Sequence, residues 1–175
     1  MSAASHPFTV ETLAFADDGT VPNNRLPLVV YRGALADDGD RARSCEVMFA
    51  ENGWPDAWRN GIYGHHHYHS TAHEVLGIAE GSARVRLGGD NGQTVELRTG
   101  DVVVIPAGVA HKRESATGDL LVIGAYPKGQ SPDICRAEPS AHDKPAANIA
   151  RVPLPAEDPV TGGAGPLLEC WKKLS

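Results

Sequence analysis

The sequence lacks any apolar run long enough to cross a membrane. A helical span needs roughly twenty consecutive apolar residues, and no segment of the 175-residue chain approaches this length. The opening stretch MSAASHPFTVETLAFADDG has neither the cationic start nor the apolar segment of a secretion signal. We therefore expect a cytoplasmic protein without a membrane partner.

A concentrated basic surface is also missing. The formal net charge is -6, and 22 acidic residues are scattered among 16 lysines and arginines. Nucleic-acid binding requires clustered basic side chains that neutralise phosphates. The region before residue 54 predicts one helix and no basic recognition helix. We therefore expect no nucleic-acid partner.

Cysteine is scarce. Cys45, Cys135 and Cys170 are odd in number and lack the paired spacing of a zinc ribbon or a thioredoxin motif. We expect them to be buried free thiols.

The length favours one compact domain, in which the pattern distinguishes three parts. Residues 1–53 predict an N-terminal extension, with a strand and a helix, that packs on a barrel. Residues 54–127 predict the core of that barrel. Residues 128–175 are rich in proline, alanine and glycine and predict a C-terminal arm of the same domain.

Helices are predicted in both flanking parts. Asp40 can cap a helix that Gly53 ends, and its apolar residues recur at helical spacing: Ala42, Cys45, Met48 and Phe49. At the other end, Pro166 can begin a short helix whose apolar face consists of Leu167, Trp171 and Leu174. This face must pack on the barrel or on a second subunit.

Between residues 58 and 126, short apolar segments alternate with glycine-rich turns, which is typical of an antiparallel sandwich or barrel. Residues 82–87 and 93–98 alternate between apolar and polar side chains, and GGDNGQ joins them, so they predict a hairpin. Two more strands are expected at 102–105 and 119–126.

The histidine-rich segment 61–81, GIYGHHHYHSTAHEVLGIAEG, is the most informative part of the chain. It places His67, His69 and Glu74 within eight residues, and His111 follows in GDVVVIPAGVAH. Imidazoles with a carboxylate suit divalent ions such as iron, manganese, nickel, cobalt or zinc. These residues predict a site for a divalent transition metal.

Strand geometry shows which of these candidate ligands can share one metal ion, because residues two apart in a strand point to the same face. His65, His67 and His69 share a face with Tyr63, and His66 faces away.

Glu74 is out of phase with His69. It converges only if residues 70–73 form a turn or bulge. Otherwise His73, which stays in phase, is the competing ligand.

The chain resembles the cupin superfamily through two motifs. The first is matched by Gly61, His67, His69, Glu74 and Gly81, and the second by Gly100, Pro106, Gly108 and His111. Ser115 replaces the asparagine that ends the second motif, a position that is not a metal ligand in the pattern. The segments HYHSTAHEVLG and PAGVAHK and the helix-bearing N-terminal extension are most similar to the small bacterial YjlB-like cupins, whose function is uncharacterised.

The resemblance implies an all-β fold, the cupin double-stranded β-helix or jelly-roll barrel, with one short N-terminal helix and a C-terminal arm or helix. It also implies that four residues bind one metal per chain inside the barrel: His67, His69, Glu74 and His111. Iron, manganese or nickel would keep two open coordination positions. Tetrahedral zinc would keep none and would suggest a structural role. Cupin barrels commonly pair by sharing sheet edges, so a homodimer is expected.

Four residues are weaker candidates for a catalytic role. His65 and His73 could orient a ligand or carry protons at the rim. Arg113 shares a face with His111 and could hold a substrate carboxylate, whereas Lys112 would face outward. Tyr63 could place a phenol near the metal, although packing is its more common role.

The leading hypothesis is a metal-dependent enzyme that acts on a small polar molecule as a dioxygenase, a decarboxylase or an isomerase. The alternative is a non-catalytic cupin that binds or senses a metal and a small ligand. A third possibility is a metal that only stabilises the barrel.

Overall fold

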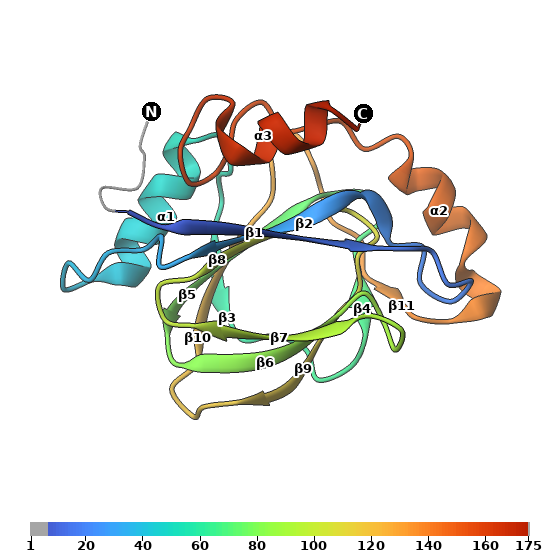
Figure 1. Ribbon diagram of the computed structural model, residues 1–175, viewed down its shortest axis with the longest axis horizontal. Coiled ribbons are helices and arrows are strands. Elements are labelled where there is room, and N and C mark those ends of the chain that lie inside the picture. Colours follow the sequence, from blue (N-terminus) through green and yellow to red (C-terminus); the bar gives the residue numbers. More distant parts are fainter. Residues whose placement is uncertain (1–6, 175) are drawn as a thin grey trace.

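A computed structural model describes residues 7–174 and contains two antiparallel sheets that face each other (Figure 1). The larger sheet has the order β1 (Thr9–Phe15), β2 (Asn24–Arg32), β8 (Val102–Ile105), β5 (Glu74–Glu80), β10 (Leu121–Ala125) and β3 (Trp58–Asn60). The smaller sheet has the order β11 (Cys135–Arg136), β4 (His67–Tyr68), β9 (His111–Ala116), β6 (Ser82–Leu87) and β7 (Gln93–Arg98). The predicted jelly-roll fold and the hairpin of β6 and β7 are confirmed.

The central strands of the larger sheet are buried on both faces. In β8, Val103 and Ile105 belong to the apolar cluster between the two sheets, whereas Val102 and Val104 belong to a second cluster under the helices. A strand covered on both sides has no polar face, because each side chain meets an apolar layer. This explains why residues 102–105 form an uninterrupted apolar run.

The N-terminal part contributes strands to the larger sheet as well as a covering helix. Strand β2 lies between β1 and β8, so these residues are integral to the sheet. Helix α1 (Arg41–Glu51) begins as predicted, with the Asp40 side chain accepting a hydrogen bond from the Arg43 amide at 3.1 Å. A Cβ atom on Gly77 of β5 would lie 2.6 Å from the Cys45 sulfur, so this glycine permits the close approach of α1.

The C-terminal part returns across the molecule and contains more regular structure than predicted. Besides β11, it forms a short 3₁₀ helix (Pro139–Ala141), α2 (Asp143–Ile149) and α3 (Gly165–Lys172). Helix α3 packs on the larger sheet, where the Trp171 indole donates a hydrogen bond to the Pro27 carbonyl at 2.8 Å. Leu167 and Trp171 are buried as expected, but Leu174 is 46% exposed, so its assignment to the packed face was wrong.

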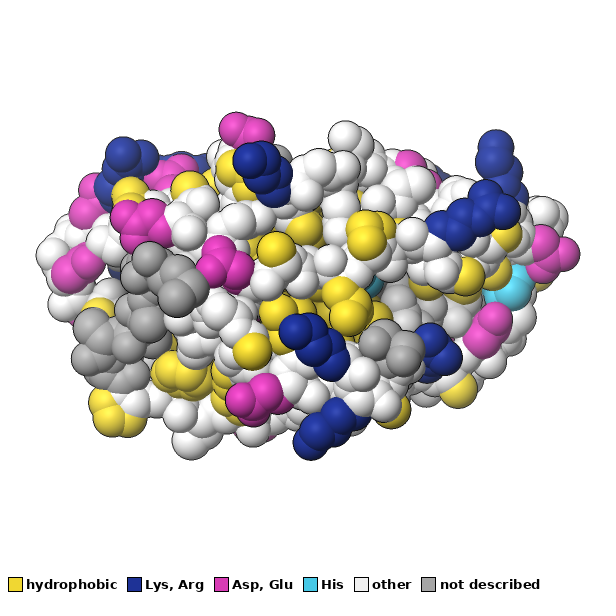
Figure 2. All heavy atoms as spheres, turned by 90° about the horizontal axis from the view of Figure 1, so that it is seen from above, with side chains coloured by type: hydrophobic (Ala, Val, Ile, Leu, Met, Phe, Trp, Pro, Cys, Tyr) yellow, Lys and Arg dark blue, Asp and Glu magenta, His cyan; other side chains and the backbone are white. Residues whose placement is uncertain are grey.

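The three cysteines are free, but only Cys45 is buried. Cys135 and Cys170 are half-buried, which corrects the expectation that all three are buried. No helix in the described part of the chain is both long and apolar enough to cross a membrane. On the face that carries the helices, basic and acidic side chains are interspersed among the described residues (Figure 2).

Candidate metal centre

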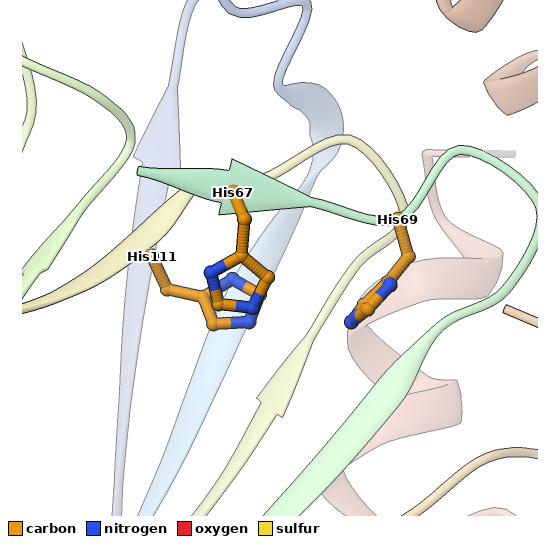
Figure 3. Close-up of side chains that lie close together, drawn as sticks. All are labelled: His67, His69 and His111. Carbon is orange, nitrogen blue, oxygen red and sulfur yellow. The ribbon is translucent and has the colours of Figure 1, made fainter. Parts of the chain in front are cut away.

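Three imidazoles converge inside the barrel (Figure 3). His67 of β4 pairs directly with His111, the first residue of β9, and their ring centroids lie 4.0 Å apart. His69 follows β4, and its ring lies 5.6 Å from that of His67 and 5.8 Å from that of His111. One nitrogen from each ring lies within 4.8 Å of the others, and all three residues are buried. Three such donors could hold a metal ion.

Glu74 reaches the same centre from the opposite sheet. It begins β5, and a bend at residues 70–71 breaks the alternation that otherwise puts it on the wrong face. Its carboxylate oxygens lie 3.1 Å from His111 Nε2 and 3.4 Å from His69 Nε2. The four residues predicted as metal ligands therefore lie together, and metal binding by them stays a prediction.

The protonation of the rings follows from their outer contacts. Each Nδ1 atom faces a backbone carbonyl. For His69 it is the carbonyl of Asp133, for His111 that of Val109 at 3.1 Å, and for His67 that of His65 at 3.5 Å. A carbonyl can only accept, so each Nδ1 donates its proton. In a neutral ring Nε2 then keeps a lone pair, whereas in a protonated ring Nε2 donates as well. The ring nitrogens of the three histidines lie close together, and the Glu74 carboxylate lies against two of the rings, so these groups are electron donors around one centre. A metal ion could bind several of these donors at once, whereas a single proton joins only two of them.

Burial and neighbouring charges shift the pKa values of the residues in the centre. Burial, together with the neighbouring His111 and His69, lowers the pKa of His67 to about 3, so its imidazole is neutral near pH 7. Burial alone would raise the pKa of Glu74, but hydrogen bonds with His111 and His69 hold it well below its usual range. Burial would lower the pKa of His69, but the hydrogen bond and the charge of Glu74 raise it. The charges of Glu74 and of a protonated His69 therefore favour each other.

The other histidines of the segment lie outside the cluster. His73 is buried, accepts a hydrogen bond from the Ala107 amide at 2.9 Å and lies 4.8 Å from the Trp171 ring, outside the group of three imidazoles. The ring of His65 stacks on Tyr63 at 5.2 Å. His66, predicted to face away, pairs with Asp90 at 2.9 Å.

A cavity of about 520 Å³ leads to the cluster. Tyr63 and Arg113, both weaker candidates from the sequence, line it. Trp58 and Tyr126 also line it, and the sequence did not predict this because both residues stand at the edges of apolar segments that indicate core. The Tyr126 ring packs edge-on against His69 at 5.8 Å, and its hydroxyl accepts a hydrogen bond from the Trp58 indole at 3.2 Å.

The C-terminal part closes one side of the centre through residues 130–135, which we call the strap. Pro132 and Ile134 of the strap line the cavity. The carboxylate of Asp133 accepts hydrogen bonds from the Ser70 amide at 2.6 Å and from the Ser70 hydroxyl, while its carbonyl accepts the hydrogen bond of His69. The strap therefore fixes the orientation of one imidazole of the cluster.

Sequence comparison identifies relatives of this chain. The family model described as Cupin domain matches residues 59–123. An uncharacterized protein, YjlB from Bacillus subtilis (strain 168), is 42% identical over 164 residues, which are 93% of this chain and 97% of the relative. This chain belongs to the YjlB-like cupin family.

Solved structures similar to this cupin include two with named ligands. Acireductone dioxygenase from Bacillus anthracis, with a cadmium ion in its active centre, is 16% identical, with 71% of this cupin and 82% of that chain covered and a TM-score of 0.39. RmlC from Streptococcus suis, in complex with dTDP-D-xylose, is 10% identical, with 74% of each chain covered and a TM-score of 0.40. These values are too low for either chemistry to be transferred to this cupin.

Proposed function

We propose that this cupin is a metal-dependent enzyme that acts on a small polar molecule. The observation that carries the proposal is the convergence of one nitrogen from each of three imidazoles on a cavity wall, with the Glu74 carboxylate against two of the rings. Mixed nitrogen and oxygen ligands favour iron(II), manganese(II), nickel(II) or zinc(II). Bound there, such an ion would act as a Lewis acid toward the oxygens of a substrate or would bind dioxygen.

The cavity supports catalysis over a purely structural metal. A structural site is closed by protein ligands on all sides, whereas this cluster borders a space of about 520 Å³ that is large enough for a small molecule. Tyr63 on its rim is 50% exposed, so the space reaches the surface. A ligand could therefore approach the metal from solvent.

The first test is the metal itself. Elemental analysis of protein purified without an affinity tag should find one transition metal per chain. Anaerobic loading with iron(II), followed by dioxygen-consumption measurements with diketones, thiols and hydroxy acids, should then reveal turnover by a dioxygenase. Product analysis with the same hydroxy acids under argon, where dioxygen is absent, should reveal decarboxylation or isomerisation.

The outcomes separate the three functional classes. Turnover with any metal supports an enzyme. Ligand binding without turnover favours a binding or sensing cupin. If chelation lowers the melting temperature while no small molecule raises it, the metal only stabilises the barrel.

A further inference from the structure

Arg113 is a cation on the cavity wall. No hydrogen bond or ion pair joins its guanidinium to another residue in the described range 7–174. Its position is nevertheless defined, because its backbone amide donates to the Tyr63 carbonyl at 2.8 Å. A Cβ atom added at Gly64 would lie 3.3 Å from an Arg113 guanidinium nitrogen, so the guanidinium lies against the glycine.

The register of β9 directs this side chain to the same face as the metal centre. In the pairing with β6, Arg113 lies opposite Val85 and His111 lies opposite Leu87. Val85 and Leu87 both belong to the apolar cluster between the sheets. Directly opposed residues project to the same face of a sheet. Arg113 and His111 are therefore two residues apart on the inner face, or about 7 Å along the strand.

The charge of the cavity is positive once a divalent ion is bound. Glu74 is the only acidic residue among the described residues that line it. Three neutral imidazoles, one carboxylate and a divalent ion sum to +1, and Arg113 raises the sum to +2. An anionic ligand would neutralise this charge, although the whole chain carries a net charge of -6.

The remaining walls are aromatic or aliphatic. The lining includes three aromatic residues, Trp58, Tyr63 and Tyr126, and three aliphatic residues, Ile62, Leu76 and Ile134. Such surfaces favour a flat or apolar body between polar ends.

We propose that Arg113 receives a carboxylate of the ligand, so that the substrate is a small carboxylic acid whose metal-chelating oxygens lie at the other end of the molecule from that carboxylate. The body between the two ends is flat or apolar. This inference rests on the proposed function for the chelating end and on Arg113 alone for the carboxylate end.

The test compares two probes that chelate alike and differ in charge, 3,4-dihydroxyphenylacetate and the neutral 4-methylcatechol. Isothermal titration of nickel(II)-loaded protein should give an affinity about 10- to 100-fold higher for the acid, as expected for a charge-assisted bidentate contact. Arg113→Ala should reduce this preference to within about twofold. Lys112→Ala is the matched control, because it removes a cation from the neighbouring residue, which lies opposite Arg86.

Nickel content, measured before each titration, separates this inference from the proposed function. Protein that takes up no nickel contradicts the metal centre. The same pair of probes is then compared on metal-free protein by ligand-observed NMR, where the preference for the acid should persist and depend on Arg113. Equal binding of both probes, or a preference that survives Arg113→Ala, would overturn the assignment whether or not nickel is bound.

Discussion

His66 and His67 are adjacent in the chain and have different chemical surroundings. The Nε2 of His66 pairs with Asp90, whereas His67 belongs to the buried imidazole cluster. We expect His67→Ala to lower the affinity for nickel(II) by more than about 100-fold, because a direct ligand is worth more than the 10- to 100-fold of an outer contact. His66→Ala should leave the affinity unchanged. Competition titration with a chelator measures both, and equal losses in the two variants would contradict the ligand assignment.

His73 should make stability depend on pH. Burial lowers its pKa to about 4 from an ordinary value of 6.5. Below pH 6.5 the His73 side chain is protonated in the unfolded chain, whereas in the folded chain it stays neutral down to about pH 4. The contribution of His73 to stability is therefore complete above pH 6.5 and is lost as the pH falls through this window. The loss is at most about 3 kcal/mol.

The check on this dependence uses urea unfolding in the presence of a chelator. Free energies of unfolding at pH 7.5 and pH 4.5 are compared for the unmodified protein and for His73→Gln, which cannot be protonated. Other groups titrate equally in both proteins, so the variant should lose less stability on acidification. Parallel losses would show that His73 does not contribute.

The sequence could predict the residues of the centre but not their protonation. Alternation along the strand groups His67 with His69, and the cupin motifs add Glu74 and His111. The choice between Glu74 and His73 depends on the bend at residues 70–71, which a period-2 pattern cannot place. The carbonyls that hold the Nδ1 atoms belong to backbone that is distant in sequence or irregular, so their positions required the structure.

The strap shows how one element controls a centre built mainly by others. Asp133 holds the strap to Ser70, and the strap carbonyl orients His69. We expect Asp133→Ala to lower the affinity for cobalt(II) by about 10- to 100-fold, because an outer hydrogen bond orients a ligand. The visible absorption of the cobalt(II) protein should also shift, which simple destabilisation would not cause.

The control for the strap is Asp143→Ala in α2, whose carboxylate contacts a half-buried histidine, His142. This variant should keep both the affinity and the spectrum. An unchanged cobalt(II) spectrum in Asp133→Ala would mean that the strap covers the centre without orienting it.

Elements with local signals were predictable, and elements fixed by distant contacts were not. Helix α1 has a capping aspartate and helical spacing within its own sequence, so its ends were predicted. Strand β11 has two residues and exists through its pairing with β4, far away in the chain. Leu174 continues the spacing of α3, but it lies two residues beyond the end of the helix and stays exposed.

At the scale of the whole molecule, β1 is an open edge of the larger sheet. It pairs only with β2 in the described part of the chain, and its sequence TVETLAF contains no lysine or proline. Soluble proteins usually protect long edge strands with such residues, because an open edge pairs readily with another chain. The 40% exposed Val10 lies on this strand. We therefore predict a homodimer in which two copies of β1 pair around a two-fold axis.

Sedimentation equilibrium should give a mass of about 37 kDa, twice the 18.5 kDa of one chain. Val10→Lys places a charge on the edge and should shift the protein toward the mass of one chain. Val47→Lys, at a valine of α1 that is 37% exposed, adds the same charge away from the edge and should keep the dimer. A single-chain mass for the unmodified protein would exclude the dimer, and dissociation by Val47→Lys alone would move the interface from β1 to the helical face.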